Sequence, residues 1–176
     1  MVMRRSAFLT AALASEAIGF LKPTISELAG KNRIERPHMQ IVVFDASTEV
    51  TDDDGVVARP PTAAEALAYE ELLGDPGIVS KGGYDVFAHR KAAQILRSGA
   101  SSSLEMLHTP AAYHAGDFPH GGGVRYEGII VGVSGVQWWM DQAIAQMIAA
   151  LIHGFCLDTL QTRIVGNKSV TFIPEP

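Results

Sequence analysis

The chain has 176 residues, of which 47% are hydrophobic and 19% are charged, so it has enough apolar side chains for a sizeable core and lacks the composition of a disordered protein. Its formal net charge of −5 argues against a general nucleic-acid binder, which needs clustered Lys and Arg to neutralise phosphates. The single cysteine, Cys156, excludes a disulfide framework and a thiolate zinc site within one chain. No uninterrupted apolar run approaches the roughly 20 residues that span a bilayer, so we expect no membrane partner.

The N-terminal segment carries two competing patterns. Its positive first residues, 1–5, and an A-x-A site at 12–14 outline a secretory signal. Apolar residues at steps of three and four nevertheless continue past that site, as one stripe of an amphipathic helix does: Ile18, Leu21, Ile25 and Leu28. This stripe favours a retained helix over about residues 6–30, bent near Pro23, and a cytoplasmic protein.

The middle of the chain alternates strand-like and helix-like segments. The run MQIVVF at 39–44 is typical of a buried strand, and an acidic, glycine-containing turn predicts a hairpin over 52–59. The T-x-x-E sequence from Thr62 to Glu65 has the form of a capping box and predicts a helix that ends near Gly74. Further along we expect a helix over 84–98 stopped by Gly99, a strand over 101–107 and a polar loop over 108–123.

The last third has the clearest pattern, two strands followed by a helix. Segments 124–126 and 129–134 predict strands joined at Glu127-Gly128, with apolar or small residues on both faces. Segment 138–153 predicts a helix with a broad apolar face and no charge over 142–150. Such a helix requires burial against a sheet or another subunit, so we expect a homo-oligomer.

Familiar catalytic and nucleotide-binding signatures are absent. No G-x-G-x-x-G follows a strand, and Gly121-Gly122-Gly123 lacks the Lys-Ser/Thr of a phosphate-binding loop. The G-V-S-G sequence at 132–135 does not have the spacing of a nucleophile elbow. We interpret Cys156, which follows the apolar helix, as a core thiol.

Three histidines recur every six residues in the polar loop, with Asp117 among them: His108, His114 and His120. Neutral imidazoles and a carboxylate are the ligands of many metal sites, and loops on a rigid scaffold often carry function. The spacing does not match the i, i+4 face of a helical zinc motif, and exposed histidines without a role are the alternative. We keep His114 and His120 as candidate ligands of a metal ion or a haem iron.

Glycine-rich motifs in the last third resemble a known family. The family pattern G-G-x-P-(I/V)…D-G…G-x-(I/V)-G-V-S-G, followed by an acidic helix start, is similar to 121–124, 127–128, 130–135 and Asp141. This pattern belongs to the haem-binding, "haem-degrading domain" family of GlcG and HbpS, which includes the C-terminal domain of PduO. Another branch of that superfamily is closer still in two stretches, R-K…R-x-G-A-S-S and H-G-G-S-F-P, which are similar to 90–102 and 114–119. Val124-Arg125 departs from the family's Pro-Ile.

The resemblance implies a single α/β (α+β) domain with a five-stranded antiparallel, PAS- or profilin-like sheet flanked by helices, assembled into a homo-oligomer. The domain would cover 1–154 with an insertion near 60–82, and 155–176 would form a C-terminal extension or arm with a β-like stretch at 170–173. Members are linked to haem, other tetrapyrroles or cobalamin, without an invariant catalytic set. The resemblance therefore supports the fold better than the activity.

Three functions stay open at this point. The first is a small-ligand-binding module for haem or a related tetrapyrrole, with His114 or His120 reaching the iron and Arg90 or Lys91 placed for the propionates. The second is a small-molecule enzyme in which the His/Asp loop supplies a metal site or a general base. The third is an oligomeric scaffold without a ligand.

The predicted ligand site lies where loop 114–119 faces the start of the helix that carries Arg90. Imidazoles, a carboxylate and paired cations would meet there, and glycines would allow close backbone approach to a ligand. In a purely structural alternative, Arg90 pairs with Asp85 or Asp117. The expected ligand-binding residues are Arg90, Lys91, His114, Asp117, His120, Gly122 and Gly123.

Overall fold

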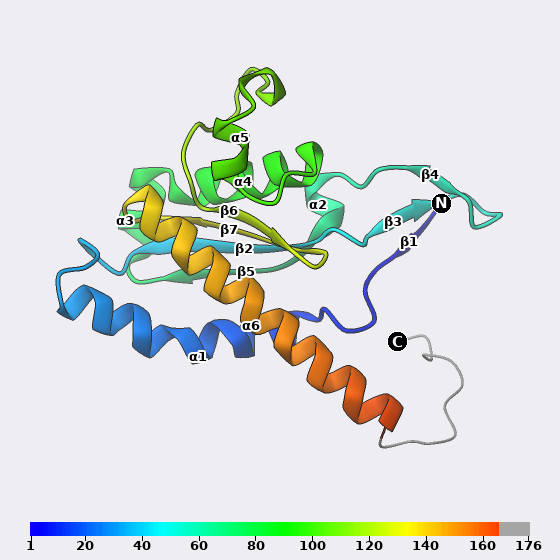
Figure 1. Ribbon diagram of the computed structural model, residues 1–176, viewed down its shortest axis with the longest axis horizontal. Coiled ribbons are helices and arrows are strands. Elements are labelled where there is room, and N and C mark those ends of the chain that lie inside the picture. Colours follow the sequence, from blue (N-terminus) through cyan, green and yellow to red (C-terminus); the bar gives the residue numbers. More distant parts are fainter. Residues whose placement is uncertain (166–176) are drawn as a thin grey trace.

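The computed structural model describes residues 1–165, which form an α+β arrangement of two antiparallel sheets and helices (Figure 1). The larger sheet has the strand order β5-β2-β7-β6, with β5 at Leu67–Leu73, β2 at Met39–Asp45, β7 at Ile129–Ser134 and β6 at Gly123–Tyr126. The smaller sheet has the order β1-β3-β4, with β1 at Val2–Arg4, β3 at Glu49–Thr51 and β4 at Val57–Arg59. The helices are α1 (Ala11–Gly30), α2 (Ala63–Ala66), α3 (Pro76–Gly82), α4 (Tyr84–Ser98), α5 (Ser103–Leu107) and α6 (Trp138–Val165), with a 3-10 turn, η1, at Pro110–Ala112.

The expected fold class is confirmed, whereas the expectation of five strands in one sheet is wrong. The chain leaves the larger sheet after β2, because Asp45 ends that strand with a turn. One carboxylate oxygen of Asp45 accepts from the N–H of Ser47 at 2.9 Å, and the other accepts from the N–H of Ser6 at 2.7 Å. Strand β3 then pairs with β1 on one edge and β4 on the other, so it has no free edge for the larger sheet.

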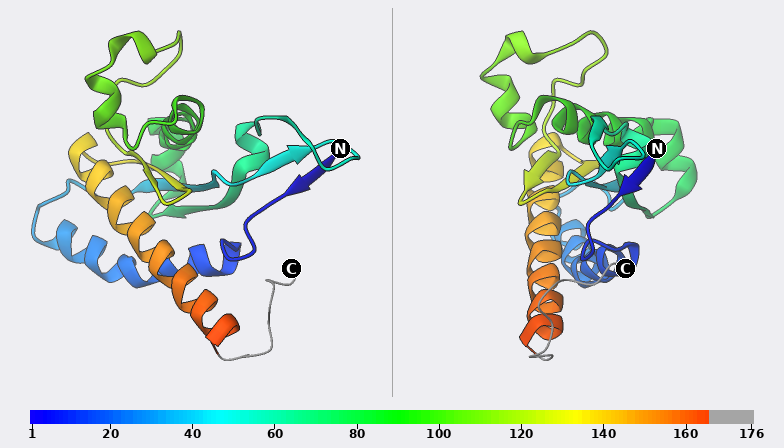
Figure 2. Two further views of the ribbon diagram at one scale, coloured as in Figure 1. Left: turned by 45° about the vertical axis from the view of Figure 1, so that its right-hand side comes forward. Right: turned by 90° about the vertical axis from the view of Figure 1, so that its right-hand side faces the viewer.

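Helices cover both faces of the larger sheet. Alternate side chains of β2 point to opposite sides, so that Ile41 and Val43 join a core with α1 and α6, and Val42 and Phe44 join a core with α4. Figure 2 shows α1 and α6 on one side of the sheet and α4 on the other. The predicted strands at 39–44 and 129–134, the hairpin at 52–59 and the helix at 84–98 are all confirmed.

The helix expected from Thr62 to Gly74 is wrong over most of its length. The capping box is present, since Thr62 accepts from the N–H of Glu65 and the Glu65 side chain accepts from the N–H of Thr62. Helix α2 nevertheless ends at Ala66, and the following residues form β5 along the edge of β2. A buried strand needs partners for its backbone N–H and C=O groups, and that requirement overrides the local helix signal.

The strand expected over 101–107 is also wrong, because Ser103–Leu107 is a helix. Ser102 is its N-cap and accepts from the N–H of Glu105 at 3.2 Å, while Glu105 accepts from the N–H of Ser101 at 2.6 Å. The sequence S-x-x-E from Ser102 to Glu105 is the signal that would have identified this helix.

Helix α6 is longer than predicted and continues to Val165, so part of the expected C-terminal arm is helical. It extends past the edge of the sheet in Figure 1. Among the described residues, α6 contains the one segment, Trp138–Arg163, that is long and apolar enough to cross a membrane by length and composition. Core helices of soluble proteins meet the same criterion, but they are mostly buried, whereas only 28% of the apolar window of this helix is buried. The β-like stretch expected at 170–173 lies outside the described residues.

Candidate functional site

Helix α4 packs close to the larger sheet because β7 has a glycine beneath it. A Cβ on Gly132 would lie 2.3 Å from the carbonyl oxygen of Ala88 and 3.0 Å from the Cβ of Ala92, so a larger residue would push the helix away. Both alanines are fully buried. This close packing brings Lys91, the neighbour of Ala92, to the C-terminal end of β7.

Lys91 is a buried cation, with a side chain that is only 2% exposed. Its Nζ donates hydrogen bonds to the carbonyl oxygen of Val133 at 2.8 Å and to Oδ2 of Asp141 at 2.9 Å. The centroid of the Phe118 ring lies 5.4 Å from Nζ, which is within the range of a cation–π contact. Lys91 therefore connects α4 to β7 and α6, and its burial is tolerated because the charge is paired and hydrogen-bonded.

Asp141 completes this ion pair from the first turn of α6. Its second oxygen, Oδ1, accepts from the N–H of Val136 at 3.1 Å. Burial raises the pKa of the Asp141 carboxyl and lowers the pKa of the Lys91 amine, while the attraction between the two charges opposes both shifts. Loss of either charge would leave the other buried without a partner.

The two candidate glycines are buried beside this pair. Gly122 has a φ of +114°, and a Cβ there would lie 2.7 Å from Nζ of Lys91. The N–H of Gly122 donates to Oε1 of Gln142 at 2.9 Å, and the N–H of Gly123 donates to Oγ of Ser103 at 3.0 Å. The protein itself thus uses both N–H groups, and the glycines make room for the lysine.

Loop 108–122 is attached to α4 through Asp117, and the partner of Asp117 is Arg97 rather than Arg90. The Nη1 and Nη2 groups of Arg97 donate to the two carboxylate oxygens of Asp117 at 2.8 Å and 2.6 Å. Oδ2 of Asp117 also accepts from the N–H of His114 at 2.7 Å. The hydrogen bonds from Arg97 are the main reason that the pKa of Asp117 lies below its usual range.

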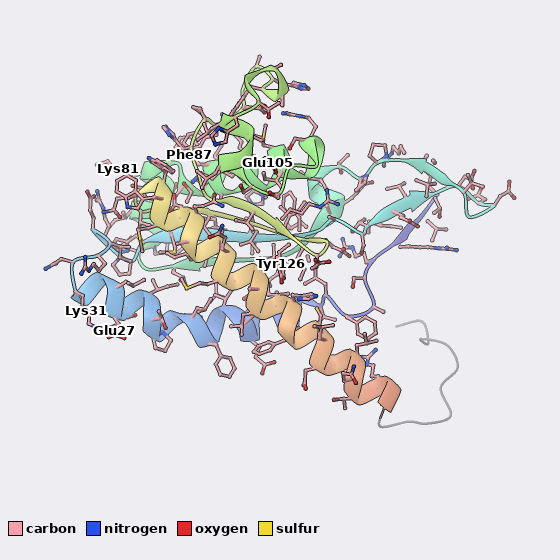
Figure 3. The ribbon with its side chains drawn as sticks, viewed as in Figure 1. Glu27, Lys31, Lys81, Phe87, Glu105 and Tyr126 are labelled. Atoms are coloured by element: carbon pink, nitrogen blue, oxygen red, sulfur yellow. The ribbon has the colours of Figure 1, made fainter. Side chains whose placement is uncertain are left out.

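After Asp117 the loop turns toward the Lys91–Asp141 pair. The N–H of Phe118 donates to Oε1 of Gln94 at 3.0 Å, and the Phe118 ring stacks on Phe87 with centroids 4.6 Å apart. The His120 ring meets Phe118 edge-on at 4.9 Å. Figure 3 labels Phe87 on α4, close to the start of α6. These contacts hold one histidine of the loop next to the buried ion pair.

The side chains just described surround an open pocket of about 320 Å³, which we call the α4–α6 pocket. Aromatic rings form much of its wall. Gln137 also contributes, and among residues 1–165 its buried Oε1 has no hydrogen-bond partner. The lining residues are Tyr84, Phe87, Lys91, Phe118, His120, Ser134, Gly135, Val136, Gln137, Trp138 and Asp141.

The structure brings two of the predicted site residues, Lys91 and His120, into this pocket. Arg90 and His114 are exposed and do not line it, and Asp117 acts through the loop. Within the part of the chain that the structure describes, no group of three or more His, Cys, Asp and Glu side chains could hold a metal ion. Metal binding by His114 and His120 stays a prediction.

Sequence reasoning missed the aromatic walls of the pocket and the role of Asp141 as the partner of Lys91. Tyr84, Phe87 and Lys91 are spaced at steps of three and four, so they share one face of α4. That stripe, followed much later by Trp138 at the start of an apolar helix, is the available signal.

The fold and the pocket define an α+β domain with a buried lysine–aspartate pair beside an aromatic pocket. No family model matches the chain, and no curated protein matches it. Among solved structures, the chain is similar to one described as "Crystal Structure of PduOC:Heme Complex". The two share 19% sequence identity with a TM-score of 0.42, over 77% of this chain and 91% of that chain.

Proposed function

We propose that this chain is a small-ligand-binding protein and that its site is the α4–α6 pocket. The observation that carries the proposal is a ring of aromatic side chains around a few fixed polar groups, namely the Lys91–Asp141 pair and the unpartnered Oε1 of Gln137. Small-molecule sites are typically apolar clefts with a small number of placed polar groups. The volume of about 320 Å³ lies at the lower end of the range for such sites.

The ligand class that we propose is haem or a related tetrapyrrole. The exposed ring of His120 at the pocket supplies an imidazole that can coordinate iron. Nζ of Lys91 has three N–H donors, of which two are used within the protein, so one remains for a ligand carboxylate. A macrocycle is larger than the pocket, so one edge would enter and its face would extend over Trp138 and Trp139, which are 39% and 55% exposed.

Haemin titration of the purified protein, followed by the Soret band, tests this proposal. We expect His120→Ala to shift the Soret band and weaken binding by about tenfold or more, because it removes the iron ligand. His114→Ala is the matched control, since it removes an exposed imidazole of the same loop that does not line the pocket.

The same titration separates the pocket from the site expected at the start of α4. If His114→Ala or Arg90→Ala weakens binding and His120→Ala does not, the ligand lies outside the α4–α6 pocket and the site is misassigned. Wild-type binding by all three variants, or no binding of haemin at all, removes the tetrapyrrole proposal.

We also propose that the chain self-associates through the outer side of α6. No charged residue lies between Asp141 and Asp158, and the exposed positions of this stretch include Ala150, Gly154 and Leu157. An uncharged exposed helix face of this kind is typical of a subunit interface.

Light scattering of an Ala150→Glu variant tests self-association without disturbing the core. Ile148, by contrast, is fully buried within its own subunit, so a charge there would unfold the domain rather than separate subunits. We expect wild-type protein to be oligomeric and Ala150→Glu to be monomeric. Ser26→Glu, at an exposed position on α1, should keep the wild-type mass. A monomeric wild type at micromolar concentration rejects the proposal.

A further inference from the structure

A second pocket, of about 430 Å³, lies toward the C-terminal end of α4. Its apolar walls come from four separate segments: Ala46 after β2, the rigid pair Pro60-Pro61 after β4, Ala63 of α2, and Ala93 and Leu96 of α4. Two guanidinium groups, those of Arg97 and Arg125, complete the lining. Within residues 1–165 no acidic side chain lines this pocket, although the chain has a net charge of −5.

The backbone of Arg125 is held by hydrogen bonds, whereas within residues 1–165 its guanidinium is free to bind a ligand. It lies on β6 opposite Ile130 of β7, and its N–H donates to the carbonyl oxygen of Ser101 at 2.7 Å. The described part of the chain provides no ion pair and no side-chain hydrogen bond for its guanidinium. Five N–H donors in a planar fork are therefore available where the pocket is lined by apolar groups.

Arg97 differs from Arg125 in having a partner. Two of its nitrogens bind Asp117, so its charge is compensated within the protein. Its contribution to the pocket is a second positive group near the first, and any anion bound there would take its principal hydrogen bonds from Arg125.

We infer that this pocket binds an oxyanion carried on a compact apolar body, which is a carboxylate or a phosphate monoester with a small aromatic or aliphatic group. The Arg125 fork matches both anions in two-point geometry. The proline and alanine walls offer a rigid apolar surface to the remainder of the molecule, and the volume of about 430 Å³ suits a small-molecule ligand. The site is separate from the α4–α6 pocket, with which it shares no lining residue.

Nuclear magnetic resonance titration of the ¹⁵N-labelled protein tests this inference with defined probes. Benzoate and phenyl phosphate carry the two anions on one apolar body, benzyl alcohol lacks the charge, and inorganic phosphate lacks the apolar body. We expect saturable shifts of amides near the end of α4 and in β6 with at least one aromatic anion, and none with benzyl alcohol. The stronger of the two aromatic probes identifies the anion as carboxylate or phosphate.

Three variants locate the binding and supply the control. Arg125→Gln should raise the dissociation constant about tenfold by removing the charged fork, and Ala93→Leu should do the same by filling the cavity. Arg33→Gln removes an exposed arginine that lines neither pocket and should leave the constant unchanged. Equal binding of inorganic phosphate and phenyl phosphate, wild-type binding by either pocket variant, or no saturable shift with either aromatic anion overturns the inference.

Discussion

The two faces of the larger sheet are buried in different ways. On one face, α1 and α6 pack with apolar side chains such as Ile18, Ile144 and Ile148, all fully buried. On the other face, α4 contributes a smaller apolar cluster, and the buried groups include Lys91 and Gln94. Both pockets described above involve α4.

This difference indicates that the α1–α6 face contributes mainly to the stability of the fold, whereas the α4 face carries the pockets. Apolar burial is the main favourable term in folding, and the α1–α6 face supplies more of it. A buried ion pair adds little net stability, because the desolvation of its charges offsets their attraction. The Lys91–Asp141 pair therefore fits a role in arranging the pocket better than a role in holding the fold together.

The largest expected effect comes from removing one charge of that pair. We expect Lys91→Met to lower the free energy of unfolding by about 3–5 kcal/mol, because Asp141 would remain buried without its partner. The double variant Lys91→Met/Asp141→Leu should recover most of that loss, since no uncompensated charge remains. Urea denaturation measures both variants. Arg90→Met, at the exposed neighbouring position, serves as control. A single variant as stable as the wild type would show that the pair is not coupled as described.

Glycine-to-alanine substitutions on the two faces of the larger sheet should change the free energy of unfolding in opposite directions. Gly132→Ala should cost about 1–3 kcal/mol, because its Cβ would meet the carbonyl of Ala88 at 2.3 Å and force α4 away from the sheet. Gly19→Ala, at an exposed position of α1, has no atom within 4 Å of the added Cβ and should stabilise the helix by about 0.5–1 kcal/mol. Thermal unfolding of the two variants gives the comparison. Equal melting temperatures would contradict the close packing of α4.

Local sequence patterns correctly predicted those strands and helices whose conformation is determined by their own residues. The strands at 39–45 and 129–134 are runs of β-branched and apolar residues, and α4 lies between glycines at 83 and 99 that both have positive φ. The segment at 67–73 could not be identified in this way, because it becomes a strand only through pairing with β2. The close approach of Gly135 to His38, whose carbonyl oxygen would lie 2.1 Å from an added Cβ, likewise depends on how the chain packs and not on local sequence.

The candidate site was less predictable, because its parts come from distant segments. The histidine spacing pointed to loop 108–122, and His120 of that loop does line the α4–α6 pocket. The partner of Lys91, in contrast, lies 50 residues away in the chain, and the choice of Arg97 over Arg90 for Asp117 depends on where the loop meets α4. Neither ion pair can be predicted from a local sequence pattern, since both depend on how the helices pack on the sheet.

The smallest expected effect concerns the attachment of the loop to α4. The Arg97 side chain is 37% exposed, so its pair with Asp117 should contribute about 1 kcal/mol or less, and Arg97→Gln should lower the free energy of unfolding by that amount at pH 7. Because the pKa of Asp117 is lowered in the folded protein, the contribution is full above the ordinary carboxyl pKa of 3.8, declines below it, and is lost as the pH falls through the lowered pKa of the folded protein.

The difference between wild type and Arg97→Gln should therefore shrink in acid, as the pH falls from the ordinary carboxyl pKa toward the lowered pKa of folded Asp117. Urea denaturation of the two proteins at pH 7 and at pH 3 measures this difference. The control is Arg90→Gln, at an exposed position of the same helix, which should have the wild-type free energy of unfolding at both pH values. Amide hydrogen exchange gives the local counterpart, since the N–H of His114 donates to Asp117 and that of Phe118 donates to Gln94. Faster exchange at both amides in Arg97→Gln would show that this ion pair holds the whole loop against α4. Faster exchange at His114 alone would show that the Gln94 contact and the Phe87 stack keep Phe118 at the pocket without it.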